Sequence, residues 1–129
     1  MSTAAWVHSL FAITLFTEDL QATKQFYKHV FELPVEYEDA NSTVFKFGET
    51  LINLLSITEA DELVKPAKVA GPVVGARAVF TIHVEDVDVM CAKLTARGVS
   101  LLNGPMDRPW GIRTASFSDP AGNIWEIAK

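Results

Sequence analysis

The chain has 129 residues, a formal net charge of −5 and 49% hydrophobic residues. This length fits one domain of ordinary size, and the high apolar content excludes an intrinsically disordered chain. The acidic balance gives no electrostatic reason to bind nucleic acid or an anionic membrane surface. Cys91 is the single cysteine, which excludes an intrachain disulfide and fits a reducing compartment. We therefore expect a folded, cytoplasmic protein that binds neither nucleic acid nor membranes.

The first apolar segment of the chain runs to Phe16, and the polar residues Thr17, Glu18 and Asp19 follow it at once. It lacks the basic residues that begin a signal peptide. No apolar run approaches the roughly 18 residues that a membrane-spanning helix needs. We interpret this first segment as a buried strand.

Two segments repeat one pattern, an apolar strand that ends in Glu-Asp before a helix. They are ITLFTEDL at 13–20 and FTIHVEDV at 80–87, so that Asp19 and Asp86 lie 67 positions apart. Each Asp carboxylate is placed to accept hydrogen bonds from the free amides at a helix N-terminus. Apolar residues then recur at three- and four-residue steps, which predicts a helix after each strand.

Three further extended segments follow each predicted helix, separated by turn residues. They are 35–38, 42–47 and 51–57 in the first copy, and 99–102, 113–117 and 124–128 in the second. The chain is thus predicted to hold two modules, at about 8–57 and 78–129, each with the order strand, helix, strand, strand, strand. The connector 58–77 is acidic at first and then rich in Pro and Gly, which is typical of a lid or a linker.

Neither module is large enough to bury a core by itself. We therefore expect a single α+β domain over residues 1–129, in which the modules pack together within one chain or exchange between two chains.

Four segments resemble the vicinal oxygen chelate superfamily, which includes glyoxalase I, bleomycin-resistance proteins, fosfomycin-resistance enzymes and extradiol dioxygenases. These segments are FTEDL with FY at 16–20 and 26–27, VEDV at 84–87, RPWG at 108–111 and DPAGNIWE at 119–126. The resemblance covers nearly the whole chain. It implies two βαβββ modules whose sheets curve around a cleft, in a homodimer. The fold hosts several chemistries, so the resemblance alone does not fix the activity.

The resemblance also implies up to four metal-ligand positions, which fall here on Ala12, Asn53, Val79 and Glu126. Only the carboxylate of Glu126 is a typical ligand, because two of the other side chains have no donor atom and the third offers a neutral amide oxygen. We therefore expect no metal or other cofactor, and disfavour metal-dependent glyoxalase, fosfomycin-transferase and dioxygenase activities. A ligand from another position or from a partner chain would change this expectation.

Three polar residues are candidates for the cleft. Strand alternation puts Glu126 on the face opposite Trp125, which is either exposed to solvent or, as the resemblance implies, lines the cleft, where the carboxylate would serve in proton transfer. Asn53 lies in an apolar strand, where an unpaired amide costs a few kcal/mol, so its partner is either a protein group or a ligand. His83 either lines the same cleft as a second proton-transfer group or ends its strand half-exposed.

A loop before the penultimate strand carries the remaining candidates. Arg108 and Trp110 offer a cation and a flat aromatic surface suited to a planar ligand, although the indole could instead cover the edge of the core. Arg113 is predicted to pair with Glu126 or with a ligand anion. Phe47 is expected in the core, with contact to the ligand as the alternative.

Two functions are consistent with these residues. The first is a metal-free protein of the glyoxalase/bleomycin-resistance type that binds a small aromatic or cationic molecule through Asn53, Glu126, Trp110, Arg108 and neighbouring residues. The second is a lyase or isomerase in which Glu126, alone or with His83, moves a proton next to a carbonyl group, with room for a weakly bound divalent metal. A scaffold with a filled cleft is a third alternative.

Overall fold

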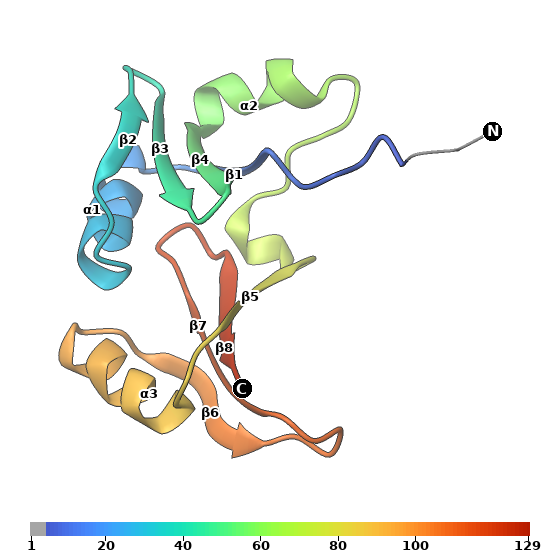
Figure 1. The fold of residues 1–129 in the computed structure, drawn as a ribbon. Coiled ribbons are helices and arrows are strands. Elements are labelled where there is room, and N and C mark those ends of the chain that lie inside the picture. Colours follow the sequence, from blue (N-terminus) through green and yellow to red (C-terminus); the bar gives the residue numbers. More distant parts are fainter. Residues whose placement is uncertain (1–4) are drawn as a thin grey trace.

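The computed structural model describes residues 5–129 and contains two four-stranded sheets, each with one helix packed on it (Figure 1). The first sheet has the order β1-β4-β3-β2 and the second has the order β5-β8-β7-β6. Their strands are β1 (Ala12–Thr17), β2 (Val35–Glu38), β3 (Ser42–Phe47), β4 (Thr50–Ser56), β5 (Val79–His83), β6 (Leu101–Asp107), β7 (Arg113–Ser118) and β8 (Ile124–Ala128). Helix α1 (Leu20–Val30) follows β1, and α3 (Val87–Ala96) follows β5. The predicted α+β fold of two βαβββ modules is confirmed.

The register of the two sheets is equivalent. In each sheet the first strand of the module runs parallel to the last, and the other pairs are antiparallel. Thr14 of β1 lies opposite Asn53 of β4, and Thr81 of β5 lies opposite Glu126 of β8. The repeat in the sequence therefore places Asn53 and Glu126 at matching points of two similar sheets.

The Glu-Asp repeats start both helices as predicted. The carboxylate of Asp19 accepts a hydrogen bond of 3.0 Å from the amide of Ala22, and that of Asp86 accepts one of 3.0 Å from Val89. Each bond satisfies an amide that has no partner within its helix.

The two modules share one hydrophobic core, built largely from aromatic side chains. Tyr27 of α1 contacts Phe45 of its own module, with ring centroids 5.7 Å apart, and Trp125 of the other module, at 6.1 Å. The buried Tyr27 hydroxyl donates to Asp119 Oδ2 at 2.7 Å and accepts from Trp125 Nε1 at 3.0 Å. Burial, together with the charge of Asp119, raises the pKa of Tyr27 well above its ordinary value, so the phenol stays protonated.

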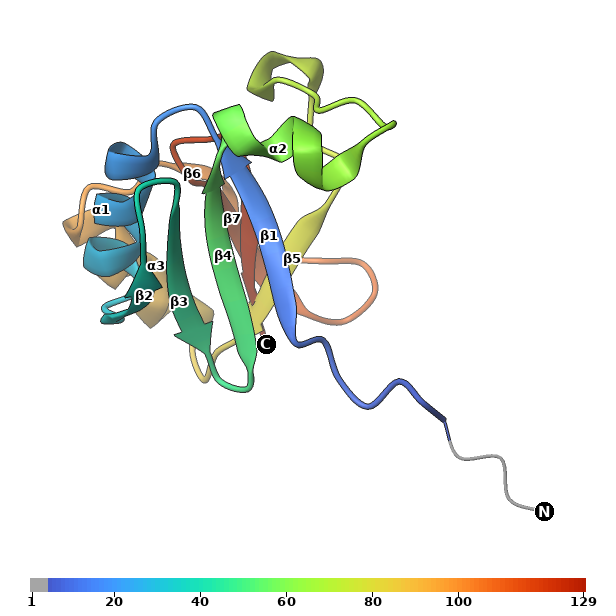
Figure 2. The ribbon, with the colours of Figure 1, turned by 90° about the horizontal axis from the view of Figure 1, so that it is seen from above.

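Residues 5–11 and the connector differ from expectation. The first strand begins at Ala12, and Trp6, Leu10 and Phe11 are exposed, so the prediction that the first apolar segment is buried as a whole was wrong. The connector begins with helix α2 (Ile57–Val64), which crosses the ends of β1 and β4 (Figure 2), and it also holds the short 3-10 helix η1 (Pro72–Val74). Within residues 5–129, no helix is long and apolar enough to cross a bilayer.

Candidate functional site

Each sheet has one face that packs in the shared core and one that is turned away from it, which we call the open face. Helix α1 packs on β3 and β4 of the first sheet and, through Tyr27, touches Trp125 of the second, so the two core faces lie toward each other. Because alternate residues of a strand point to opposite faces, Asn53 lies on the open face of the first sheet and Glu126 on that of the second. Both side chains therefore lie opposite the core.

The amide of Asn53 is incompletely paired. Its Nδ2 lies 3.4 Å from Thr14 Oγ1, and its Oδ1 is buried without a hydrogen-bond partner. Turning the amide over would exchange the two atoms and leave Nδ2 as the unpaired one. A polar atom that loses its water without a replacement costs about 1–3 kcal/mol, and a ligand that bonded to it would recover that energy.

Glu126 occupies the matching point of the second sheet. Its Oε1 accepts a hydrogen bond of 2.9 Å from Thr81 Oγ1, and Ser116 lies opposite it on β7. Within residues 5–129, no protein donor bonds to its other carboxylate oxygen. His83 is exposed two residues beyond Thr81 on the same face, about 7 Å further along the strand, and is not hydrogen-bonded to Glu126.

Thr14 and Thr81 also belong to the site, although the sequence analysis did not predict them. Thr14 and Thr81 are 67 positions apart, like the two capping Asp residues, so the repeat itself held the signal. Each threonine hydroxyl lies beside the polar residue of the neighbouring strand and fixes how that side chain lies.

The four positions at which the resemblance implies metal ligands carry few donor atoms. Ala12 and Val79 present methyl groups, and Asn53 and Glu126 lie on different sheets with different threonine partners. Within the part of the chain that is described, no group of three or more His, Cys, Asp or Glu side chains is placed to hold a metal ion. One amide and one carboxylate on separate faces do not fit a transition-metal centre.

The loop between β6 and β7 is fixed through Arg108. The Arg108 Nε donates to Thr114 Oγ1 at 2.8 Å and Nη2 donates to Asn103 Oδ1 at 3.0 Å. Thr114 shares its strand face with Ser116, so the guanidinium lies on the open face that carries Glu126. The guanidinium carbon is 5.9 Å from the ring centroid of Trp110, whose surface is 69% exposed. The indole is therefore available for stacking.

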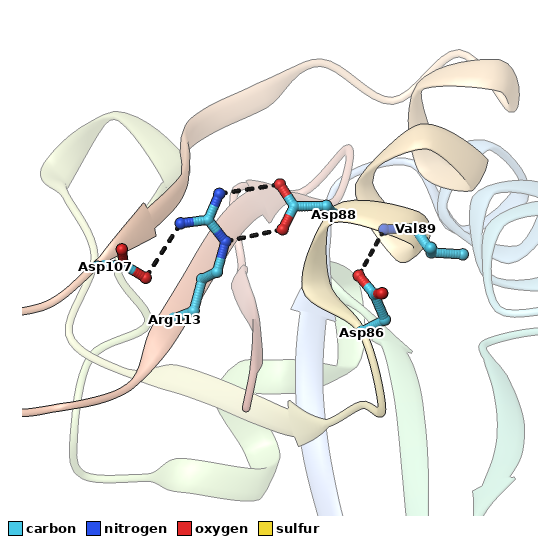
Figure 3. A network of polar contacts seen from close by, with 5 residues as sticks. All are labelled: Asp86, Asp88, Val89, Asp107 and Arg113. Atoms are coloured by element: carbon cyan, nitrogen blue, oxygen red, sulfur yellow. Dashed lines mark hydrogen bonds and ion pairs between the residues drawn. The ribbon is translucent and has the colours of Figure 1, made fainter.

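The predicted pairing of Arg113 with Glu126 was wrong. Arg113 donates from Nε and Nη2 to both carboxylate oxygens of Asp88, at 2.8 and 2.9 Å, and from Nη1 to Asp107 at 3.1 Å (Figure 3). The reason is strand parity, because Ser116, three residues along β7, lies opposite Glu126 and Arg113 points to the other face. The hydrogen bonds raise the pKa of Arg113 and lower that of Asp88.

Phe47 also lies on the core side of its sheet. Its ring stacks on Trp125 with centroids 5.2 Å apart and contacts Phe31 at 5.0 Å. It lines a cavity between the modules and not the open face that carries Asn53. The structure therefore separates Phe47 from the other candidate residues.

Comparison with known proteins agrees with this geometry. Residues 9–127 match the family model of the Glyoxalase/Bleomycin resistance protein/Dioxygenase superfamily. The uncharacterized protein YraH of Bacillus subtilis (strain 168) is 34% identical over 124 residues, which are 93% of this chain and 97% of YraH.

Solved structures share the fold at lower identity. A glyoxalase/bleomycin resistance protein/dioxygenase from Nocardioides superposes with a TM-score of 0.84 at 22% identity, covering 97% of this chain and 85% of that one. A lactoylglutathione lyase from Agrobacterium tumefaciens gives 0.77 at 22% identity, covering 96% and 95%. The expected membership is thus confirmed, and the chain belongs to the glyoxalase/bleomycin resistance protein/dioxygenase superfamily.

Proposed function

We propose that this protein binds a small planar molecule, aromatic or cationic, on its open sheet faces and without a transition metal. The observation that carries the proposal is the unpaired, buried amide atom of Asn53, set at the point that matches Glu126 in the other sheet. An amide with an unmet hydrogen bond is suited to a ligand that supplies this bond once the side chain turns toward the open face.

The chemistry of the ligand follows from the neighbouring groups. The carboxylate of Glu126 has one oxygen free of protein donors and is matched by a cationic group, whereas the cation of Arg108 already bonds to Asn103 and Thr114. The exposed indole of Trp110 provides a stacking surface for a planar ring. Such a ligand would gain affinity by stacking on Trp110, and the amide of Asn53 and the carboxylate of Glu126 would orient it.

Closure of the site calls for a second copy of the chain. The open faces of one chain are turned away from its common core, so Asn53 and Glu126 of the same chain do not face each other. In a homodimer the first sheet of one protomer would be covered by the second sheet of its partner, and the two polar groups would meet across the interface. Exposed apolar side chains near these faces, Val79 and Met106 among them, supply area for that contact.

The proposal is tested by titrating the full-length protein with a planar aromatic cation, such as ethidium, and with a neutral aromatic of similar size. Tryptophan fluorescence and thermal shift report binding, and sedimentation reports the oligomeric state. Glu126→Gln should weaken binding of the cation about tenfold and leave the neutral compound nearly unaffected, because it removes only the charge. Glu36→Gln, an exposed glutamate of β2 without an ion pair, is the matched control.

Two results would overturn this proposal. One is the absence of any aromatic binder in the screen. The other is a stoichiometric transition metal in protein purified without chelators, measured by elemental analysis, because the metal-free assignment of the site would then fail.

A second function is supported by the way Glu126 is held. The Thr81 hydroxyl fixes one carboxylate oxygen and leaves the other free, which suits a base that removes a proton next to a carbonyl group in a lyase or isomerase. Exchange of such protons for deuterium, followed by NMR over a panel of carbonyl compounds, tests this without knowledge of the product. Exchange that is lost in Glu126→Gln while folding is retained would support the enzyme over simple binding.

A further inference from the structure

A cavity of about 760 Å³ lies between the two modules, on the core side of both sheets. Its volume falls within the range of roughly 300–1,000 Å³ that is typical of small-molecule sites. Its walls are mostly apolar and come from both modules, with Phe47 and Ile52 from the first and Phe80 and Trp125 from the second. Neither Asn53 nor Glu126 lines it, although Thr81, the partner of Glu126, forms part of its wall. The groups that would contact a ligand here therefore differ from those of the open faces.

Helix α3 contributes both apolar and cationic side chains to one wall of the cavity. Met90 and Leu94 line it with apolar atoms, and Lys93 and Arg97, on the same stretch of the helix, line it with cations. Residues three and four apart share one face of a helix, so these four side chains form a continuous strip. At the end of α3 the carbonyl of Thr95 accepts a hydrogen bond from Gly98, and that of Leu94 accepts one from Val99.

The charges that line the cavity are predominantly positive. They are those of Lys46, Lys93 and Arg97 against the single carboxylate of Glu32. That carboxylate is already engaged by Arg97, which also donates from Nη1 to the carbonyl of Val30 at 2.8 Å. Within residues 5–129, neither lysine belongs to an ion pair. Lys46, one residue before Phe47, points to the opposite face of β3, so the cavity combines an apolar interior with the uncompensated ammonium group of Lys93.

We propose that this cavity binds an amphipathic anion, a molecule with an apolar body and a single carboxylate. The body lies against Phe47, Phe80 and Trp125, and the carboxylate meets Lys93, with the guanidinium of Arg97 fixed beside it. Burial of the apolar body drives binding, and the cations select an anionic head over a neutral or positive one. The chemistry is opposite in charge to that proposed for the open faces.

The test uses three probes of equal chain length, decanoate, decanol and decyltrimethylammonium, each kept below the concentration at which it forms micelles. Calorimetric titration of the full-length protein should give one decanoate per chain, with decyltrimethylammonium at least about tenfold weaker and decanol between them. Trp125 lines the cavity and is already buried, whereas Trp6 and Trp110 are exposed and lie outside it, so decanoate should change the intensity of tryptophan emission with little shift in wavelength.

Substitution separates the charge contact from simple partitioning. Lys93→Gln should weaken decanoate about tenfold and change decanol little, whereas Lys28→Gln, an exposed lysine of α1 outside the cavity, should change neither. Equal affinity for the three probes, or no effect of Lys93→Gln on a variant that circular dichroism shows to be folded, would overturn the proposal. So would displacement of decanoate by a planar cation that binds the open faces, because the two sites are expected to fill independently.

Discussion

Removal of one oxygen atom from the shared core tests how the two modules are held together. In Tyr27→Phe the ring keeps its aromatic contacts, so the change acts through the two hydrogen bonds of the hydroxyl. Asp119 still accepts hydrogen bonds from the amides of Ala121 and Asn123 and from Asn123 Nδ2, so its carboxylate stays paired within the protein. Trp125 Nε1, in contrast, loses its acceptor inside the core.

The expected loss follows from these contacts. A buried donor left without a partner costs about 1–3 kcal/mol, and the lost bond to a charged acceptor adds about 1 kcal/mol once the remaining donors of Asp119 are allowed for. We therefore expect the free energy of unfolding to fall by about 3 kcal/mol. In a domain of this size that lowers Tm by roughly 10 °C.

Urea and thermal unfolding, followed by circular dichroism at neutral pH, measure this loss. The matched control is Tyr37→Phe, which makes the same change on a tyrosine that is 58% exposed and whose hydroxyl donates to Asp39 at 3.2 Å. The control should lose less than about 0.5 kcal/mol. If Tyr27→Phe lost as little as the control, the hydroxyl would not join the modules and the reasoning would be refuted.

Two further predictions concern stability. Arg113 lowers the pKa of Asp88 below its ordinary value of 3.8. The ion pair therefore makes its full contribution to the free energy of unfolding above that pH, and the contribution is lost as the pH falls through the lowered pKa. Asp88→Asn should accordingly lower Tm at pH 7 and have much less effect at pH 2, with the unpaired Asp61→Asn as control; equal effects at both pH values would contradict the linkage. Gly104→Ala should cost more than about 2 kcal/mol, because its Cβ would collide with the Thr114 carbonyl oxygen and lie 2.7 Å from the Ala115 Cα atom. Gly48→Ala, also at positive φ but with open space around it, should cost only about 1 kcal/mol in urea unfolding, and equal costs would exclude the collision as the cause.

Much of the fold could be predicted because the same strand and helix pattern occurs twice in the sequence. The Glu-Asp repeats carry local hydrogen-bonding chemistry that starts a helix wherever it occurs, and both caps formed as predicted. The predicted strand boundaries agree with the structure where turn residues flank the strand, as in β3. Helix α2 was not predicted, because the Pro and Gly residues later in the connector indicated a loop for the whole segment.

The site was less predictable, since it depends on which strand faces meet. Alternation within β8 sufficed to separate Glu126 from Trp125. Asp88 could not be found as the partner of Arg113 from spacing, because their contact depends on where α3 packs relative to β7. The cavity between the modules has no linear signature at all, because its lining residues come from distant segments of both modules.

The link from Tyr27 to Asp119 and Trp125 also has a consequence for synthesis of the protein. These partners follow the tyrosine by 92 and 98 positions, so its hydroxyl keeps water as its partner until β8 has been made. At about 5–20 residues per second that wait lasts roughly 5–20 s, during which the aromatic face of α1 has no second module to cover it. The first module therefore exposes apolar surface during synthesis until β8 is available to pack against it.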